Sequence, residues 1–439
     1  MAKRITLRIP WNLLVTLVAY YLFSEMYVKL VVPTFNWGGM TYNPRDNGIV
    51  ELALLVFTSL LLPNKVKNPC DLYNWLYFVI LLIPSAVLSA EQGSNHFHLL
   101  LMFAALWLLM LFRRIFARVF YRRIIAHPMN YRHLPYQSVF LYILGVLIFL
   151  AVSVHGAFSL NFYKVYEFRF DISENMPLVF QYMLPLAAIT LIGYLAALTY
   201  HRKNTKILFL IAVIGILFFG FSSNKSMLFY PLVAMAGYFL FKMSRPHLLI
   251  LGGFSILAKI TLLLPEGGSN LLGALFANRI VFIPSHINYF YFDFFSNNPK
   301  MLWAESKISL GLITSELPMG VMKYIGGLMT GNYDFSSNTG WVANAYMNAG
   351  IIGIVIYAAI IGYIFSLIDF WAKIYGKQLV GAAFLIPVIT LIMSADLLIV
   401  LLTTGLIFLL MIFQVTTRGI FIHKNDGFRN EHIGAPHNA

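Results

Sequence analysis

Long apolar runs separated by short polar segments make up most of this chain. Twelve runs of about 15 to 23 residues carry few charges, and a helix of about that length crosses about 30 Å of hydrocarbon. Their apolar residues do not alternate with polar ones, as in membrane-barrel strands, so the runs predict helices. We therefore expect an all-α polytopic membrane protein with about 12 transmembrane helices. The predicted spans are residues 11–33, 48–63, 72–90, 98–112, 138–155, 178–199, 207–223, 226–241, 248–264, 350–370, 379–394 and 397–415.

The loops between these spans are of very unequal length. Residues 265–349 form a loop of about 85 residues, and an ordered loop this long usually has a function. Residues 156–177 form a second loop on the same side, and residues 113–137 form a basic loop on the other side. We treat residues 1–439 as a single membrane domain. The seventh and eighth spans, and the eleventh and twelfth, could instead be re-entrant hairpins.

The charged residues orient the spans. Only 11% of residues are charged and 59% are hydrophobic, whereas soluble domains carry about 25% charged residues. The net charge is +14, but most Lys and Arg residues fall in alternate loops, so membrane orientation explains this charge better than nucleic-acid binding. The positive-inside rule predicts cytoplasmic termini and places residues 265–349 outside. Cys70 is the only cysteine, so the chain cannot form an internal disulfide.

Two outward segments contain cations with candidate chemistry. The loop after the fifth span contains Tyr166 and Arg169, and the planar guanidinium group of arginine matches phosphate oxygens. Alternatively, Arg169 pairs with neighbouring acids while the aromatic residues form an interfacial belt. Asn224 and Lys225 lie among hydroxyl groups in the turn after the seventh span, near a helix start that favours anions. The alternative for Lys225 is a lysine that extends toward the membrane surface.

The large loop combines cationic, aromatic and amide side chains. Arg279 lies on an amphipathic stretch, and an aromatic-rich segment, residues 285–295, follows it. Such a segment suits a membrane interface, stacking on sugars, or both. Amide and aromatic residues near the end of the loop suit sugar hydroxyls, although a polar helix start capped by Ser337 or Asn338 is the alternative. The candidate substrate-binding residues are Tyr166, Asn224, Tyr289, Tyr291, Asn338, Trp341, Asn344, Tyr346 and Asn348.

Several common catalytic motifs are absent. The sequence contains no Walker A motif, no Gly-x-Ser-x-Gly and no His-Glu-x-x-His, which argues against an ATP-driven pump and against the corresponding hydrolases. No Asp-x-Asp pair lies in an outer loop, so we expect no bound metal and no cofactor. His96 and His98 could form a metal pair, but we interpret them as an interfacial turn.

Short segments across the chain together resemble the O-antigen polymerases of the Wzy type, the oligosaccharide repeat-unit polymerases. Tyr166-Glu-Phe-Arg169 resembles the family's Tyr-Glu-x-Arg segment, and the turn from Gly220 to Ser226 resembles its Gly-x-Lys/Arg turn. Asn278-Arg279 resembles the start of its long loop, and Ala343–Gly353 resembles the motif that ends it. The resemblance covers nearly the whole chain in topology. Many relatives carry an acid where this chain has Asn344, so any general base must lie elsewhere.

This resemblance implies a C-type glycosyltransferase architecture in the bacterial inner membrane, with the active site facing the periplasm. A glycan on undecaprenyl pyrophosphate would be the donor, and the non-reducing end of a new lipid-linked repeat unit would be the acceptor. Arg169, Lys225 and Arg279 would stabilise the charge that develops on the pyrophosphate. His286, Asp293 and Glu305 are candidate bases, and His286 ranks first because its ordinary pKa lies near neutrality. A chain-length regulator protein is a candidate partner.

Two other functions remain open at this point. An O-antigen ligase would move the same glycan onto lipid A core, and we would expect a histidine in the motif that ends its loop. A flippase would move the lipid-linked unit without breaking a bond, and it would not need so large an outer loop. These alternatives share the membrane helices and the glycolipid ligand, so they differ from a polymerase in chemistry rather than in location.

Overall fold

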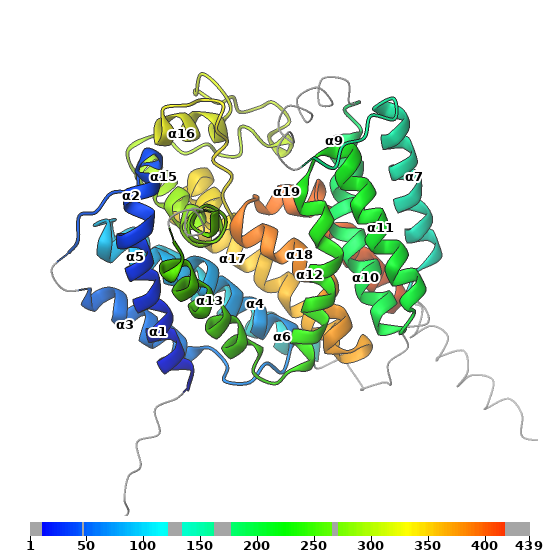
Figure 1. Cartoon of the computed structure of the whole chain (residues 1–439), viewed down its shortest axis with the longest axis horizontal. Coiled ribbons are helices and arrows are strands. Elements are labelled where there is room, and N and C mark those ends of the chain that lie inside the picture. Colours follow the sequence, from blue (N-terminus) through cyan, green and yellow to red (C-terminus); the bar gives the residue numbers. More distant parts are fainter. Residues whose placement is uncertain (1–10, 46–47, 122–133, 162–176, 266–270, 418–439) are drawn as a thin grey trace, which may run out of the picture. The chain divides into compact units, whose positions relative to one another are not determined.

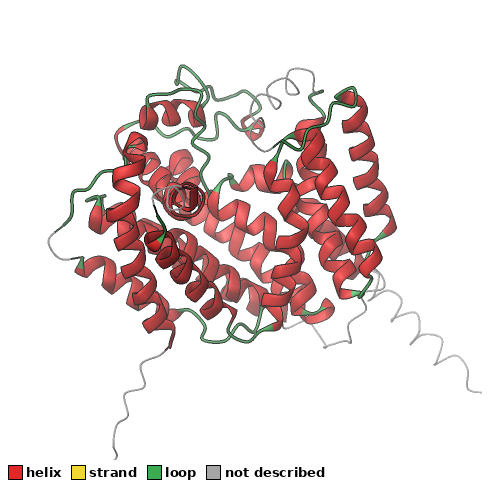
Figure 2. Cartoon of the chain, viewed as in Figure 1, coloured by secondary structure: helices red, strands yellow, loops and turns green. Residues whose placement is uncertain are grey.

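The structure is a computed structural model, and it describes residues 11–45, 48–121, 134–161, 177–265 and 271–417. Within these ranges the regular elements are all helices and no residue is in a strand (Figure 2). Seven helical stretches are long and apolar enough to cross a membrane, which indicates a multi-pass membrane protein. They are Trp11–Phe35, Pro69–Glu91, His96–Arg118, Phe180–His201, Thr205–Ser222, Pro246–Leu263 and Trp341–Tyr375.

The remaining predicted spans also coincide with helices in the described part of the chain. Four of these helices are apolar but shorter: Ile49–Leu61, Gln137–Ser153, Lys377–Met393 and Leu406–Thr417. The eighth span corresponds to α12, Lys225–Lys242. The twelfth span is interrupted, because α19 is Leu397–Leu402 and the next helix begins at Leu406. The helical nature of the spans is therefore confirmed, while their number as full membrane crossings stays a prediction.

The chain divides into two compact units. Unit 1 comprises Met1–Arg123, Met243–Leu367 and Val388–Leu398, and unit 2 comprises Ile124–Lys242, Ile368–Pro387 and Ile399–Ala439. The large loop predicted at residues 265–349 falls entirely within unit 1, together with the helices next to it (Figure 1).

Unit 1 contains both long apolar helices and shorter elements from the large loop. Its elements up to the large loop are α1 Trp11–Met26, the π-helix Tyr27–Val31, α2 Val32–Phe35, the 3-10 helix Asn36–Gly38, α3 Ile49–Leu61, α4 Pro69–Tyr77, the π-helix Phe78–Leu82, α5 Ile83–Glu91, α6 His96–Tyr121 and α13 Pro246–Leu263. Within the continuous stretch Pro69–Glu91, residues 69–90 are all buried by their neighbours. A helix enclosed on every side has no polar face, which explains why this part of the sequence is predominantly apolar.

The start of α4 is held by a capping box and an ion pair. Asn68 and Asp71 form the reciprocal capping box that stabilises a helix N-terminus. The Asp71 carboxylate also accepts a hydrogen bond of 2.8 Å from Arg113 on α6. Both side chains are largely buried, so this pair ties α4 to α6 at the end of unit 1 that is rich in Lys and Arg. We call this end the basic end.

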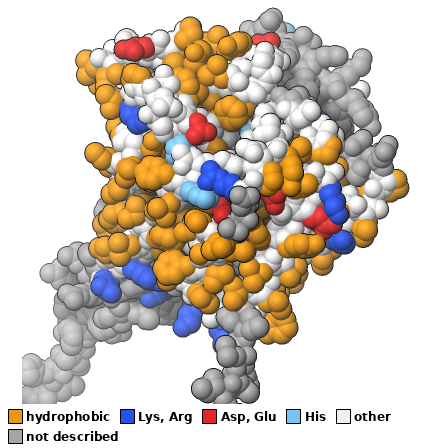
Figure 3. Space-filling view, turned by 90° about the vertical axis from the view of Figure 1, so that its left-hand side faces the viewer, with side chains coloured by type: hydrophobic (Ala, Val, Ile, Leu, Met, Phe, Trp, Pro, Cys, Tyr) orange, Lys and Arg blue, Asp and Glu red, His pale blue; other side chains and the backbone are white. Residues whose placement is uncertain are grey.

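The loops of unit 1 fall at two opposite ends of its helices. At the basic end, the Val66 N–H group donates to the carbonyl oxygen of Ser244 at 2.9 Å. At the other end, which we call the loop end, the Asn43 N–H group donates to Glu91 at 2.9 Å, and Gln92 donates to Gly39 at 3.0 Å. Figure 3 shows Lys and Arg side chains gathered toward the lower edge of one face, where the basic end lies. The alternation of loops between two ends agrees with the predicted topology for this unit.

Most of the predicted large loop is helical and belongs to unit 1. Its elements are a π-helix Gly273–Phe282, α15 Ile283–Asn297, a 3-10 helix Lys307–Ser309, α16 Val321–Thr330 and the first part of α17, Trp341–Tyr375. α17 therefore starts nine residues before the predicted span at residue 350. Figure 1 shows α15 and α16 at the loop end, beside α2. The loop is thus a packed helical layer rather than an extended connection.

A backbone break inside α17 separates the loop helix from the predicted span. Gly350 has φ +61° and ψ −141°, a conformation that is essentially restricted to glycine. The preceding segment of the loop covers the break: the Met301 and Leu302 N–H groups donate to the carbonyl oxygens of Met347 and Asn348, each at 3.0 Å. The backbone groups freed by the break thus regain partners, as buried polar groups require.

Unit 2 is a second group of helices with an aromatic core. Its elements are α7 Gln137–Ser153, α9 Phe180–Pro185, the π-helix Leu186–Leu191, α10 Ile192–His201, α11 Thr205–Ser222, α12 Lys225–Lys242, the end of α17, most of α18 Lys377–Met393 and the helix Leu406–Thr417. Trp371 stacks on Phe384 and Phe413, with ring centroids 6.1 and 5.6 Å apart. Of the two smaller predicted loops, residues 162–176 and 122–133 lie outside the described residues.

Candidate functional site

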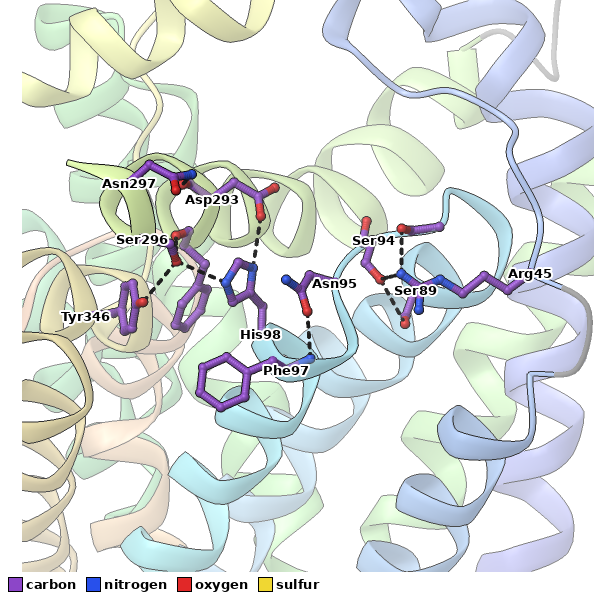
Figure 4. Close-up of polar contacts among 12 residues, drawn as sticks. Arg45, Ser89, Ser94, Asn95, Phe97, His98, Asp293, Ser296, Asn297 and Tyr346 are labelled. Atoms are coloured by element: carbon purple, nitrogen blue, oxygen red, sulfur yellow. Dashed lines mark hydrogen bonds and ion pairs between the residues drawn. The ribbon is translucent and has the colours of Figure 1, made fainter.

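An acid and a histidine from distant parts of the sequence meet at the loop end of unit 1 (Figure 4). Asp293 Oδ1 on α15 lies 3.0 Å from His98 Nδ1 on α6. The His98 side chain is only 4% exposed, whereas the Asp293 side chain is 61% exposed. The carboxylate is therefore accessible to a ligand, while the imidazole ring that contacts it is buried.

The aromatic run of α15 determines how this pair is positioned. Phe292 and Phe295 are buried and anchor the inner face of the helix. Asp293 directly follows Phe292, so it projects away from that inner face, about 100° further around the helix. His98 stacks on the Phe292 ring with centroids 5.3 Å apart. The same aromatic anchor thus fixes both members of the pair.

The contacts continue from His98 to the first part of α17. His98 Nε2 lies 3.1 Å from Ser296 Oγ, which lies 3.0 Å from the hydroxyl of Tyr346. The ammonium group of Lys300 lies 4.5 Å from the centre of the Tyr346 ring, a cation–π contact. Asp293, His98, Ser296, Tyr346 and Lys300 form what we call the acid–imidazole chain.

The hydrogen atoms in this chain can be assigned from its partners. Ser296 has one hydroxyl proton, which it donates to the carbonyl oxygen of Phe292 at 2.7 Å. His98 Nε2 must therefore donate to Ser296, because the serine oxygen can only accept. His98 Nδ1 lies 3.0 Å from Asp293 Oδ1 but makes no hydrogen bond in this arrangement. An exposed carboxylate of this kind is a type of group that serves in general acid–base catalysis.

His96 belongs to a different network, two residues before His98. Its Nε2 atom lies 2.8 Å from Glu51, a carboxylate that is 1% exposed. Glu51 also accepts a hydrogen bond of 2.6 Å from Ser89, while nearby Arg45 donates to two backbone carbonyl groups at 2.9 Å each. The two histidines thus contact different acids, and no group of three or more metal-ligating side chains occurs among the described residues.

His286, which ranked first as a base from the sequence, is enclosed by the protein. The residue is only 1% exposed, and its Nε2 atom lies 2.9 Å from the carbonyl oxygen of Gly38. Burial disfavours the charged ring and lowers the pKa of His286 to about 4. Because Asp293 is exposed and His286 is not, the geometry favours Asp293 as the group that meets a substrate.

The aromatic candidates of the large loop mostly serve its packing. Tyr289 and Tyr291 are buried, and their hydroxyl groups donate to the carbonyl oxygens of Ser85 and Ser337 at 3.0 and 3.1 Å. Trp341 is 1% exposed at the start of α17. Burial with satisfied hydroxyl groups is the ordinary state of core tyrosines. These three side chains do not present a surface to a sugar in this structure.

Two of the three candidate asparagines in the large loop are likewise occupied by backbone groups. Asn344 donates to Thr339 and Gly340 at 2.8 and 3.0 Å. Asn348 donates to Asn344 at 2.9 Å and accepts the Trp303 N–H at 2.8 Å. The alternative of a structural helix start therefore describes Asn344 and Asn348 better than sugar binding does. The third, Asn338, is exposed and accepts a hydrogen bond from Ser336 at 3.3 Å.

The three cations proposed for a pyrophosphate lie in different parts of the chain. Tyr166 and Arg169 are outside the described residues. Arg279 is exposed in unit 1, on the π-helix Gly273–Phe282. Lys225 is exposed in unit 2 at the first position of α12, after Asn224, whose side chain accepts hydrogen bonds from the next serine. Their assembly into one clamp therefore stays a prediction.

The chain matches no protein-family model, no curated protein and no solved structure. The resemblance to repeat-unit polymerases therefore rests on the short segments quoted above. The candidate site rests separately on the contacts of the acid–imidazole chain. Among the residues of the acid–imidazole chain, the sequence predicted Asp293 and Tyr346 as candidate site residues, but not His98, Ser296 or Lys300. The sequence analysis considered His98 only with His96, as a possible metal pair or an interfacial turn at the outer end of a predicted span.

Proposed function

We propose that this chain is a glycosyltransferase that polymerises lipid-linked oligosaccharide repeat units. In this proposal the growing glycan moves from undecaprenyl pyrophosphate to the non-reducing end of a new lipid-linked unit, at the periplasmic face of a bacterial inner membrane. Three features support it: the multi-pass apolar helices, the resemblance of the loop segments, and an exposed carboxylate backed by a buried imidazole. The last feature carries the proposal.

The proposed reaction gives each part of the site a role. A hydroxyl group of the acceptor sugar attacks the anomeric carbon of the donor, and the bond from that carbon to the pyrophosphate oxygen breaks. The bonding electrons leave with undecaprenyl pyrophosphate, and the hydroxyl proton passes to Asp293. His98 is a positioning residue, because it contacts Asp293 and not the substrate. Asp293 thereby takes the role that an acid at position 344 would play in many relatives.

The cations complete this scheme on the donor side. Negative charge grows on the pyrophosphate as the glycosidic bond breaks, and fixed cations stabilise that transition state. Arg169, Arg279 and Lys225 are the proposed cations, with no bound metal. A chain-length regulator stays a candidate partner, with both termini of the chain in the cytoplasm.

The deciding experiment uses purified full-length protein and a defined undecaprenyl-pyrophosphate-linked repeat unit. The proposal expects a ladder of products, and a strong loss of the ladder in the Asp293→Asn variant. A wild-type protein that is folded and gives no ladder would exclude polymerisation. Gene deletion separates the alternatives: loss of a polymerase leaves core with one repeat unit, whereas loss of a ligase leaves uncapped core.

A second candidate chemistry follows from the order Asp293, His98 and Ser296, which matches that of a serine nucleophile with its base and acid. The Ser296 hydroxyl already donates to Phe292 at 2.7 Å, so His98 does not accept its proton, and we favour glycosyl transfer. A fluorophosphonate probe decides between them. Labelling that the Ser296→Ala variant abolishes would establish the serine chemistry, and an unlabelled but active protein would exclude it.

A further inference from the structure

An open cavity of about 480 Å³ lies inside the helical layer of the large loop, close to the acid–imidazole chain. It is bordered by the end of α15, the segment after it and the start of α16, all in unit 1. This volume is within the range of about 300–1,000 Å³ that small-molecule sites occupy. Its lining residues include Phe294, Asn298, Lys300, Thr314, Glu316 and Tyr324.

Lys300 joins this cavity to the candidate site. Lys300 lines the cavity, and its ammonium group lies over the Tyr346 ring and bonds to the carbonyl oxygen of Phe295. Lys300 is also the end of the acid–imidazole chain, which leads through Tyr346 to Asp293. In addition, α15 supplies Phe294 to the cavity and Asp293 to the chain from consecutive positions. A ligand in the cavity would therefore lie next to the elements that carry the proposed base.

The chemistry of the lining suits a sugar. The rings of Phe294 and Tyr324 meet edge to face with centroids 5.8 Å apart, and aromatic surfaces of this kind pack against the C–H faces of sugar rings. Asn298 donates to the Phe294 carbonyl at 2.7 Å, which leaves its side-chain oxygen as an acceptor. Thr314 and Glu316 add a hydroxyl group and a carboxylate.

The charges that line the cavity favour a sugar over a pyrophosphate as its ligand. Lys300 contributes one positive charge and Glu316 one negative charge to the same lining. A site built for pyrophosphate would not place a carboxylate beside the ligand, because like charges repel. Hydroxyl groups, in contrast, can donate to the carboxylate and accept from the ammonium group. We propose that this cavity is a saccharide-binding subsite for the glycan of the substrate; that it serves polymerisation rests on the proposed function.

The test measures sugar binding without catalysis. Purified full-length protein in detergent is titrated with free glucose, galactose, N-acetylglucosamine and rhamnose, and with inorganic pyrophosphate, by saturation-transfer NMR. Thr314→Trp fills the cavity, and Leu312→Trp is its matched control, because Leu312 is 86% exposed and does not line the cavity. Glu316→Gln removes the acceptor charge, and Asp334→Asn, at an exposed position of the same loop, is its control.

We expect at least one sugar to bind the wild type and both controls. Thr314→Trp should lose that binding, and Glu316→Gln should weaken it about tenfold, the effect of about one charge-assisted hydrogen bond. Displacement of the sugar by pyrophosphate, absence of binding by all four sugars, or unchanged binding in both cavity variants would overturn the subsite. Glu316→Gln keeps the test valid if the bulkier variant does not fold.

The two proposals fail in different ways. If the wild type binds a sugar and Thr314→Trp does not, but the wild type makes no ladder, the saccharide subsite is supported and polymerisation is excluded. If Thr314→Trp makes a ladder of normal length at the normal rate, a role for the subsite in polymerisation is excluded and the polymerase proposal stands. Reduced sugar affinity with a raised KM for the acceptor would support both.

Discussion

Replacing His98 with phenylalanine should separate the role of the acid–imidazole chain from its contribution to stability. The phenylalanine ring keeps the volume and the stacking on Phe292 but removes both ring nitrogens. The lost contact with Asp293 should cost about 0–1 kcal/mol of folding free energy, because that carboxylate is 61% exposed and solvent screens the pair. The lost hydrogen bond to Ser296 adds about 1 kcal/mol. The variant should therefore remain folded.

The effect on the reaction should be much larger than the effect on folding. General acid–base catalysis contributes about 10²–10⁴-fold to a rate, and a base that has lost its orienting partner should lose about 10²-fold in kcat. KM should change little, because His98 is buried and acts in this proposal only through Asp293. The assay is the rate of ladder formation from a defined lipid-linked repeat unit, with thermal stability measured on the same samples.

His286→Phe is the matched control for this prediction. It makes the same chemical change at a second buried histidine that lies on α15 but bonds to Gly38 rather than to Asp293. Its rate should stay within a few-fold of the wild type once loss of folded protein is corrected. Equal rates for the wild type and His98→Phe, together with an inactive His286→Phe, would refute the choice of Asp293 and restore His286 as the base.

Four further predictions concern stability, pH and the donor site. The pKa of His286 is about 4 in the folded protein and about 6.5 in the unfolded chain, so the unfolded state binds more protons between these two pH values. The free energy of unfolding should therefore fall by about 3 kcal/mol as the pH drops from 7 to below 4. Thermal melts across this pH range should show a weaker pH dependence in His286→Phe than in the wild type. Gly350→Ala should destabilise the protein by about 1–3 kcal/mol in chemical unfolding, because φ +61° with ψ −141° excludes a side chain; an unchanged midpoint would contradict the break in α17. Asp71→Asn should cost about 2–3 kcal/mol through the buried bond to Arg113, with the melting temperature as the measurement and wild-type behaviour as the contrary result. Arg279→Ala should abolish the ladder with normal expression, and Arg279→Lys should restore only part of it, since lysine lacks the planar fork; a normal chain length in Arg279→Ala would exclude this residue from the donor site.

Sequence reasoning was most successful for the helices themselves. Each predicted span coincides with a helix in the described residues, because a membrane helix satisfies its own backbone and is read from one continuous apolar run. It was less successful for boundaries. The span predicted from residue 350 belongs to a helix that begins at Trp341, because polar and aromatic residues at its start are buried by other elements rather than exposed in a loop.

The roles of individual side chains were much harder to predict. The aromatic run of α15 contains no alternation that would separate buried Tyr289 and Tyr291 from exposed Asp293. Which of them faces inward depends on the helices that pack against α15, and those helices are far away in the sequence. The sequence ranked His286 above Asp293 because the ordinary pKa of histidine lies near neutrality. In the structure His286 is buried and Asp293 is exposed, so the order of the two candidates is reversed.

The sequence by itself therefore determined the helical membrane character, the approximate spans and the presence of a large, chemically varied loop. These properties follow from local composition and periodicity, which short windows of the chain contain in full. Only the tertiary structure decided that the loop is a packed helical layer and that His98 meets Asp293 at 3.0 Å. A contact between α6 and α15 depends on how two separate helices pack, and neither helix carries that information alone.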